Sequence, residues 1–167
     1  MVNVPVNPRV NVLFVCLGNI CRSPTAEGVF RHLVRAEGLD GVIGADSAGT
    51  GAWHVGEPPD RRAQAAARRR GVDLSDLRGR QVRIADFDAF DYLLAMDRRN
   101  HAVLASLAPK GREDSLHMLL SFAPHLDILE VPDPYYGGGD GFEMVLDMIE
   151  AASRGLLEHI RRTHLEP

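Results

Sequence analysis

Two side chains with complementary chemistry, Cys16 and Arg22, lie six positions apart near the start of the chain. Gly18 between them permits a tight backbone bend, and Ser23-Pro24 directly after Arg22 is typical of a helix N-terminus. Loop N–H groups, the positive end of a helix dipole and a guanidinium that grips two oxygens can together bind an oxyanion. The spacing therefore predicts an anion-binding loop with a thiol at its base.

Cys16 can act as a nucleophile only as the thiolate, whereas an ordinary free cysteine is mostly protonated at neutral pH. A helix N-terminus stabilises a nearby anion by only about 0.3–1 kcal/mol. We therefore expect Arg22, the loop N–H groups and the Ser23 hydroxyl to supply the rest. Two other interpretations of Cys16 carry less weight: an unreactive buried thiol at a strand end, and a zinc ligand, for which no paired histidine spacing is present.

The elements that must position this loop follow from hydrophobic periodicity and from glycine and proline punctuation. Strands are expected at Val10–Val15, Val42–Ser47, Tyr92–Met96 and Leu116–Leu120, and helices at Ser23–Gly38, Asp60–Arg70, about Asp97–Leu107 and Phe142–Ile160. Their alternation predicts an α/β fold: a single domain over residues 1–167, with a four-stranded parallel sheet and helices on both faces. Residues 1–9 are expected to form a flexible N-terminal extension. Such sheets bind ligands beyond the carboxyl ends of their strands, and Cys16 follows the first strand.

The composition argues against several classes of partner. Among 167 residues, 19 are basic and 23 acidic, and the net charge of −4 disfavours nucleic acid and anionic membranes. The apolar run Val10–Leu17 is too short to span a bilayer. The arginines at 61–62 and 68–70 are expected on a solvated helix face. Two cysteines without an export signal predict reduced thiols and a cytoplasmic location.

Several motifs in order along the chain resemble one known family. They are Cys16-Leu17-Gly18-Asn19-Ile20-Cys21-Arg22-Ser23-Pro24, Asp46-Ser47-Ala48-Gly49-Thr50, Trp53, Pro58-Pro59-Asp60 and Asp133-Pro134-Tyr135-Tyr136-Gly137. Together they resemble the low molecular weight protein-tyrosine phosphatases, and the resemblance runs from about Val10 to His164. It implies a phosphatase I-like, Rossmann-like topology.

The resemblance also implies a mechanism. Cys16 would attack phosphorus and form a phosphocysteine, Arg22 would hold two phosphoryl oxygens, and Asp133 would protonate the leaving phenolate and then activate water. No metal and no cofactor are implied, because the loop itself stabilises the transferring group. The implied partner is a tyrosine-phosphorylated protein, such as a tyrosine kinase, with the enzyme a monomer or weak dimer. Without the resemblance, Asp133-Pro134 is as consistent with an ordinary turn as with a general acid.

Further residues take roles from the same resemblance. The loop residues Leu17, Gly18, Asn19, Ile20, Cys21 and Ser23 would surround the phosphate, and Trp53, His54, Tyr135 and Tyr136 would form the substrate cleft. The aromatic cleft residues can sandwich a phenyl ring, although exposed loop aromatics are the alternative. A related branch that acts on phosphoarginine carries Thr at the position of Ile20, so Ile20 favours phosphotyrosine.

The loop is expected to depend on a supporting polar network that includes Asn19, Ser23 and Ser47. Relatives carry a histidine where this chain has Leu77, or Asp76 if the alignment shifts, so we expect weaker support and a less ionised Cys16. The resemblance implies a reversible disulfide between Cys16 and Cys21 under peroxide; a small apolar filler is the alternative role for Cys21.

Two other functions stay open at this point. One is an arsenate reductase that uses an external thiol, because the further downstream cysteines of such enzymes are absent. The other is a non-catalytic module that binds phosphotyrosine. Metal-independent hydrolysis of an aryl phosphate that is lost on replacement of Cys16 discriminates against both.

Overall fold

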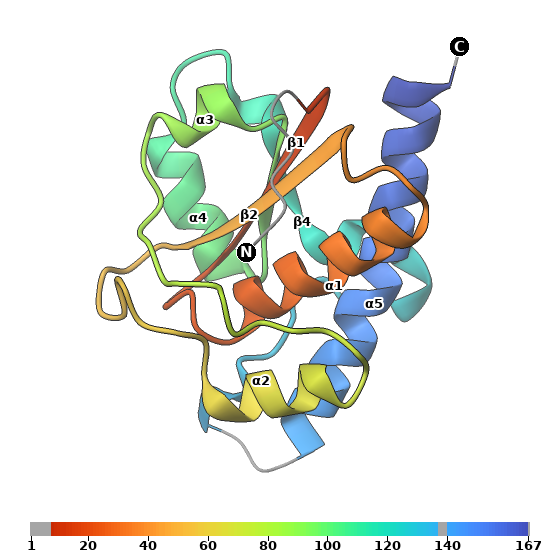
Figure 1. Ribbon diagram of the computed structural model, residues 1–167. Coiled ribbons are helices and arrows are strands. Elements are labelled where there is room, and N and C mark those ends of the chain that lie inside the picture. Colours follow the sequence, from red (N-terminus) through yellow and green to blue (C-terminus); the bar gives the residue numbers. More distant parts are fainter. Residues whose placement is uncertain (1–7, 137–139, 167) are drawn as a thin grey trace.

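The computed structural model describes residues 8–136 and 140–166, and its centre is a four-stranded parallel β-sheet (Figure 1). The strands are β1 (Val10–Cys16), β2 (Ile43–Gly49), β3 (Tyr92–Ala95) and β4 (Leu116–Met118), in the order β2-β1-β3-β4. β1 pairs with β2 on one side, from Val10 opposite Ile43 to Cys16 opposite Gly49, and with β3 on the other. The order reverses at β1, so Cys16 ends the strand at the switch point, where sheets of this type bind ligands.

Four of the five α-helices in the described residues cover the two faces of the sheet, and the fifth packs against two of the other helices (Figure 1). The five helices are α1 (Arg22–Ala36), α2 (Arg61–Arg68), α3 (Asp86–Ala89), α4 (Arg98–Leu107) and α5 (Asp140–Ile160), with α5 running into a π-helical turn at Arg161–Leu165. α1 and α5 lie against one face and α3 and α4 against the other. The predicted α/β fold with helices on both faces is therefore confirmed.

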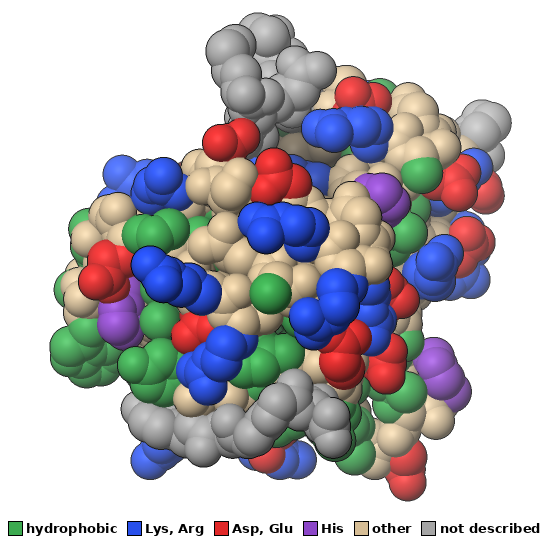
Figure 2. Space-filling view, turned by 60° about the horizontal axis from the view of Figure 1, so that its bottom comes forward, with side chains coloured by type: hydrophobic (Ala, Val, Ile, Leu, Met, Phe, Trp, Pro, Cys, Tyr) green, Lys and Arg blue, Asp and Glu red, His purple; other side chains and the backbone are tan. Residues whose placement is uncertain are grey.

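The arginine-rich helix α2 packs beside α5 through charged contacts. Arg69 and Arg70 lie 2.7 and 3.0 Å from carboxylate oxygens of Glu143, and Arg70 also lies 2.9 Å from Asp147. The face seen in Figure 2 carries basic side chains interspersed with acidic ones.

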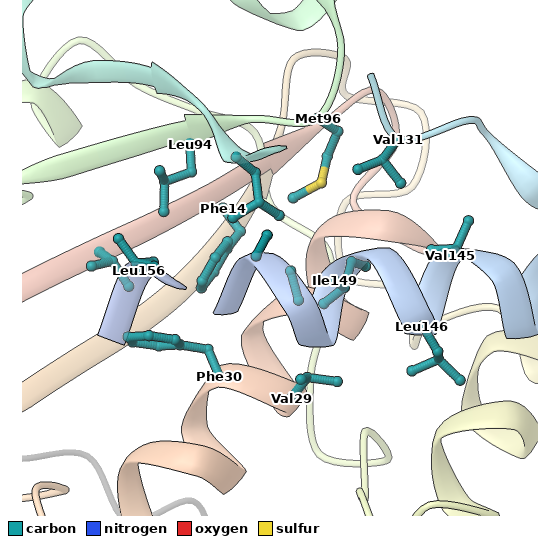
Figure 3. Packing of buried hydrophobic residues seen from close by; sticks show 14 of the residues in the cluster. Phe14, Val29, Phe30, Leu94, Met96, Val131, Val145, Leu146, Ile149 and Leu156 are labelled. Carbon is teal, nitrogen blue, oxygen red and sulfur yellow. The ribbon is translucent and has the colours of Figure 1, made fainter. Parts of the chain in front are cut away.

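The core explains why β1 is apolar at nearly every position. Val12 and Phe14 face the α1 and α5 side, whereas Leu13 and Val15 face the α3 and α4 side, and all four are fully buried. Figure 3 shows Phe14 close to Phe30 of α1, with ring centroids 5.6 Å apart in an edge-on arrangement. Such a pair adds about 0.5–1.5 kcal/mol beyond the burial of its area. This packing fixes β1 and α1, and therefore the two ends of the loop between them.

Some predicted elements differ from those observed. β4 ends at Met118, and Leu119–Phe122 forms a 3₁₀ helix instead of extending the strand, because Leu119 and Leu120 are buried in the cluster that contains α5. Helix α3 was not predicted. Helix α1 begins at Arg22 with Cys21 at its N-cap, so the interpretation of Ser23 as the N-cap was wrong.

The expected N-terminal extension, residues 1–9, lies mostly outside the described residues. Arg9, which is described, donates from its backbone N–H to Val42 at 2.8 Å and from its side chain to the backbone oxygen of His164 at 2.8 Å. The segment at Gly137, Gly138 and Gly139, expected as a flexible connection, also lies outside the described residues. None of the helices in residues 8–136 and 140–166 combines the length and the apolar character that a bilayer crossing needs.

Candidate active site

The loop of residues 17–21 turns its carbonyl oxygens outward into hydrogen bonds with the surrounding chain. Of the loop and the residue before it, Cys16 accepts from the Thr50 N–H and Leu17 from the Gly51 N–H, both at 2.9 Å. Ile20 accepts from the Asp60 N–H at 2.8 Å, and Cys21 from the Thr25 N–H at 3.3 Å. In the described chain, the N–H groups of Gly18, Ile20 and Cys21 donate to no protein acceptor. A loop with outward carbonyls and unused N–H groups at a helix N-terminus is built to receive an anion.

Two backbone features permit this tight path. Asn19 adopts the left-handed conformation with φ at 59°, which asparagine tolerates better than most residues. Gly49, at the end of β2, lies directly beneath the loop, and a Cβ there would approach the carbonyl oxygen of Leu17 to 2.9 Å. The close contact between β2 and the loop therefore requires glycine at position 49.

The sulfur of Cys16 is at the base of this loop and is held by two polar groups. The Asn19 N–H donates to Sγ at 3.3 Å, and the Ser23 hydroxyl lies 3.0 Å from Sγ. Cys16 is 2% exposed and Ser23 is fully buried. A sulfur with two such neighbours can carry negative charge without leaving the protein interior, because hydrogen bonds to the charged form favour it.

Hydrogen bonds link Asn19 to Ser23, Ser47 and Arg80 next to the loop. The Asn19 side-chain amide donates to the hydroxyls of Ser23 and Ser47 at 2.8 and 3.0 Å, and its oxygen accepts from the Arg80 N–H at 2.9 Å. Leu77 is half-buried and packs against the hydrophobic core instead of taking part. The side chain of Leu77, one of the two positions at which relatives carry a histidine, therefore adds no polar contact to this network, and both polar atoms of the Asn19 side chain have partners.

Glu27, which the sequence analysis did not single out, lies at the far end of this network. It is 2% exposed, accepts from the Ser47 hydroxyl at 2.7 Å and pairs with Arg31 at 2.7 Å. Burial raises the pKa of the Glu27 carboxyl to about 7, and Arg31 and the hydrogen bond from Ser47 only partly oppose this effect. Its position on α1, one turn beyond Ser23, is the only sequence signal that could have indicated it.

Arg22 is 2% exposed and its guanidinium is oriented by acceptors from two other elements. One terminal nitrogen, Nη1, lies 2.7 Å from a carboxylate oxygen of Asp97 and 3.0 Å from the Val131 carbonyl oxygen. Burial alone would lower the pKa of Arg22, but the negative charges of Cys16, Asp97 and Asp133 outweigh it and raise that pKa. Asp97 was predicted only as the start of a helix, and the structure adds this second role.

Asp133 lies beside the guanidinium of Arg22. Its Oδ2 is 3.6 Å from Nη2 of Arg22, and its Oδ1 accepts from the Tyr135 N–H at 3.0 Å. Pro134 begins the 3₁₀ turn Pro134–Tyr136 that fixes this arrangement. The Asp133 side chain is 28% exposed and lines the pocket.

These residues enclose a pocket of about 400 Å³. It is lined by Cys16, Leu17, Gly18, Ile20, Cys21, Arg22, Trp53, His54, Asp133 and Tyr135. Trp53 and Tyr135 are 72% and 40% exposed and stand at its mouth. Of the predicted cleft residues, the side chain of Tyr136 lies outside the described residues. Asn19, Ser23 and Ser47 lie beneath the pocket and support its loop.

Cys21 lines the same pocket as Cys16. Burial raises the pKa of the Cys21 thiol far above its ordinary value, and the carboxylate of Asp60 adds to this effect. Cys21 is therefore a protonated thiol at neutral pH, and both cysteines are free. In the described part of the chain, no three histidine, cysteine or acidic side chains are grouped so that they could hold a metal ion.

Comparisons with known proteins find the same pattern. The family model described as low molecular weight phosphotyrosine protein phosphatase matches residues 11–165. The chain is 45% identical over 153 residues to low molecular weight protein-tyrosine-phosphatase YfkJ of Bacillus subtilis, covering 92% of this chain and 97% of that protein. It is 48% identical over 153 residues to low molecular weight protein-tyrosine-phosphatase of Streptomyces coelicolor, covering 90% and 93%. The crystal structure of YfkJ superposes with a TM-score of 0.89 at 43% identity, covering 95% of this chain and 99% of that one.

Proposed function

Because the chain belongs to the low molecular weight phosphotyrosine protein phosphatase family, we propose that this protein-tyrosine phosphatase works through a phosphocysteine on Cys16, with Arg22 binding the phosphoryl group and Asp133 as general acid and base. The observation that carries the proposal is the placement of the Cys16 sulfur at the base of a pocket with unused N–H groups. Arg22 and Asp133 line the same pocket, 3.6 Å apart.

In the first step the Cys16 thiolate attacks phosphorus, an S–P bond forms and the bond from phosphorus to the phenolic oxygen breaks. The loop N–H groups and Arg22 bind the equatorial oxygens, where negative charge is concentrated in the transition state. Protonated Asp133 gives its proton to the departing oxygen. Ser23, at 3.0 Å from Sγ, stabilises the thiolate before attack.

In the second step the S–P bond is hydrolysed. Asp133, now a carboxylate, takes a proton from water as the water attacks phosphorus, and Cys16 leaves as the thiolate. Inorganic phosphate is released and the starting protonation states are restored. The proton lost by Asp133 in the first step is regained from water, so the two steps balance.

The walls of the pocket favour phosphotyrosine among phosphorylated residues. The phosphate site is buried, so only a long, flat side chain places its phosphorus next to Cys16 while its ring lies between Trp53 and Tyr135. Ile20 on the loop has no hydroxyl that could form a hydrogen bond with a phosphoguanidinium group. A tyrosine-phosphorylated protein, for instance a tyrosine kinase, is the substrate class that fits.

The remaining properties follow from chemistry and surface. Both cysteines of the pocket are free thiols, and free thiols persist in a reducing compartment, so we place the enzyme in the cytoplasm. The interspersed charges in Figure 2 argue against nucleic acid as a partner. The enzyme is expected to act as a monomer or weak dimer, because the pocket is complete within one chain.

The proposal is tested by hydrolysis of p-nitrophenyl phosphate and of a phosphotyrosine peptide in the presence of a chelator. We expect activity with chelator that falls by more than about a thousandfold in Cys16→Ser. Peptides with phosphoserine or phosphoarginine serve as matched substrates and should react far more slowly. Activity that survives Cys16→Ser contradicts the proposal. Arsenate reduction with glutathione but no hydrolysis would identify a reductase, and tight phosphotyrosine binding without turnover would identify a binding module.

A further inference from the structure

Arg62, on the exposed face of α2, contacts three parts of the chain: Asp60, Tyr135 and Phe142. Its Nη2 donates to the carbonyl oxygen of Tyr135, which lines the pocket, at 3.0 Å. Its Nε and Nη2 also donate to the two carboxylate oxygens of Asp60, at 3.2 and 3.1 Å. The guanidinium carbon lies 5.6 Å from the ring centroid of Tyr135 and 4.9 Å from that of Phe142, within the range of cation–π attraction.

Both hydrogen-bonding partners of Arg62 are themselves connected to the reacting groups. The Asp60 N–H donates to the Ile20 carbonyl oxygen at 2.8 Å, which ties Asp60 to the phosphate-binding loop. The Tyr135 N–H donates to Oδ1 of Asp133 at 3.0 Å, which orients the carboxylate. Arg62 therefore completes a continuous path of contacts from the loop to Asp133. Each step of this path is either a hydrogen bond between two residues or runs through the covalent structure of a single residue.

We propose that Arg62 is a positioning residue that holds Asp133 at its working distance from the phosphate-binding loop by clamping the turn at Tyr135 to Asp60. This inference rests on the role of Asp133 as general acid in the proposed function. Arg62 does not line the pocket, so it acts on the reaction through Asp133 and not by contact with the phosphoryl group.

The chemistry of the guanidinium suits this task. Its planar fork can bind the Asp60 carboxylate with two nitrogens while the same side chain donates to Tyr135 and stacks on the rings, whereas a lysine ammonium is a point charge on a flexible stem. Burial opposes ionisation of Asp60, but hydrogen bonds from Arg62 and from the first turn of α2 lower the pKa of Asp60. The clamp is therefore charged on both sides across neutral pH.

The surroundings also make Arg62 suitable for mutagenesis. Its side chain is 47% exposed, so its removal leaves no cavity in the core. Asp60 keeps its hydrogen bonds from the Arg62 and Ala63 N–H groups, at 2.8 and 3.3 Å, whatever the side chain at position 62. Arg61, its exposed neighbour on the same helix, provides a control with the same change of charge.

The test compares two aryl esters that differ in their need for a proton. The leaving group of phenyl phosphate needs protonation by Asp133, whereas that of dinitrophenyl phosphate departs readily as an anion. The quantity measured is kcat/KM, which covers the steps up to cleavage of the ester. We expect Arg62→Ala to lower kcat/KM about tenfold for phenyl phosphate and less than twofold for dinitrophenyl phosphate. Arg61→Ala should change neither value. An equal loss on both esters overturns the inference.

Two further variants separate clamping from a general effect of charge. Arg62→Lys keeps the charge but not the fork and should retain most of the defect on phenyl phosphate; full recovery in this variant overturns the inference. Combining Arg62→Ala with Asp133→Ala should give no further loss on phenyl phosphate beyond Asp133→Ala alone, because residues that act through one group are not additive. A further tenfold loss in the double variant means that Arg62 acts independently, which also overturns the inference.

Asp133→Ala, measured on the same two esters, separates failure of the inference from failure of the proposed function. If Asp133→Ala loses both activities equally, the acid role itself is wrong. If Asp133→Ala lowers kcat/KM mainly for phenyl phosphate and Arg62→Ala lowers it equally for both esters, the acid role holds and only the clamp is wrong.

Discussion

Nη1 of Arg22 lies 2.7 Å from Oδ2 of Asp97, a residue 75 positions away in the sequence. The other oxygen of the same carboxylate accepts from the Asn100 N–H at 2.8 Å and caps α4. One carboxylate therefore fixes the N-terminus of α4 and the guanidinium at the start of α1. This arrangement orients Arg22 before any substrate binds, so that no reorganisation is needed at the moment of transfer.

Asp97→Asn tests this pre-orientation. The amide keeps the size and an acceptor oxygen but loses the negative charge that pairs with the Arg22 guanidinium, and hydrogen bonds to charged groups are worth about 1.5–3 kcal/mol. We expect the inhibition constant of vanadate, which adopts the five-coordinate geometry of the transferring group, to increase at least about tenfold. Glu130→Gln, which removes an exposed partner of Arg98, is the control and should leave vanadate inhibition unchanged. Unchanged or tighter vanadate binding in Asp97→Asn contradicts the role of Asp97.

The buried carboxyl of Glu27 makes stability depend on pH. Its pKa is about 7 in the folded protein against an ordinary 4.5, so folding favours the protonated form. The stabilisation is complete below pH 4.5 and is lost as the pH rises through about 7, a change of roughly 3 kcal/mol in the free energy of unfolding. Glu27→Gln should remove this dependence, so urea denaturation between pH 5 and pH 8 should show a flatter profile than the wild type. Glu158→Gln, at an exposed position of α5, should keep the wild-type profile, and identical profiles for wild type and Glu27→Gln would refute the role of Glu27.

The two cysteines should differ in reactivity despite sharing a pocket. Burial raises the pKa of Cys21, so its thiol stays protonated, whereas the proposed mechanism requires Cys16, which lies beside Ser23 and Asn19, to react as the thiolate. Brief treatment with iodoacetate at neutral pH, followed by mass spectrometry of the peptides, should find the label on Cys16 alone. Cys21→Ser should be inactivated by iodoacetate at about the wild-type rate. Label on Cys21 at a comparable rate would show that the assignment of thiolate to Cys16 is wrong.

Gly155 is the position in α5 where a methyl group should be least tolerated. A Cβ there would lie 1.8 Å from the backbone oxygen of Phe122. Alanine normally stabilises a helix interior by about 1 kcal/mol relative to glycine, but overpacking against backbone typically destabilises by about 1–3 kcal/mol. We expect Gly155→Ala to lower the free energy of unfolding by about 2 kcal/mol. In Gly28→Ala the added Cβ contacts the end of the Leu74 side chain, which can move. This variant should therefore lower the free energy of unfolding by less than Gly155→Ala does. A Gly155→Ala protein more stable than the wild type would contradict the close packing.

The parts of the fold that the sequence predicted are those with strong local signals. β1 is apolar on both faces because it lies at the centre of a covered sheet, and Asp60 marks the start of α2 because its side chain caps that helix. Helix α3 has only four residues and was missed, since its stability comes from burial of Phe87 in the cluster that contains Leu13 and Val15. No periodicity can be read from so short an element.

The residues of the candidate site also fall into those that a local sequence signal identified and those that only the fold brings together. Cys16 and Arg22 were identified together because they belong to one short loop, and Asp133 could be assigned only through a resemblance. Asp97, Glu27 and Arg62 were not given roles, because each acts through contacts that the fold creates between distant segments. Ser23 was expected both to cap the helix and to place its hydroxyl beside the Cys16 sulfur; the hydroxyl lies 3.0 Å from that sulfur, but Cys21 occupies the cap position.

The central claim is that the phosphoryl group passes through a covalent bond to the sulfur of Cys16. Rapid acid quenching during turnover of a phosphotyrosine peptide with radiolabelled phosphate, followed by digestion and mass spectrometry, tests it directly. We predict label on the peptide segment that contains Cys16, attached to that residue and not to Cys21, and no phosphoenzyme in Cys16→Ser. Steady turnover with no label on Cys16, or with the label carried by another pocket residue such as His54, would contradict the account.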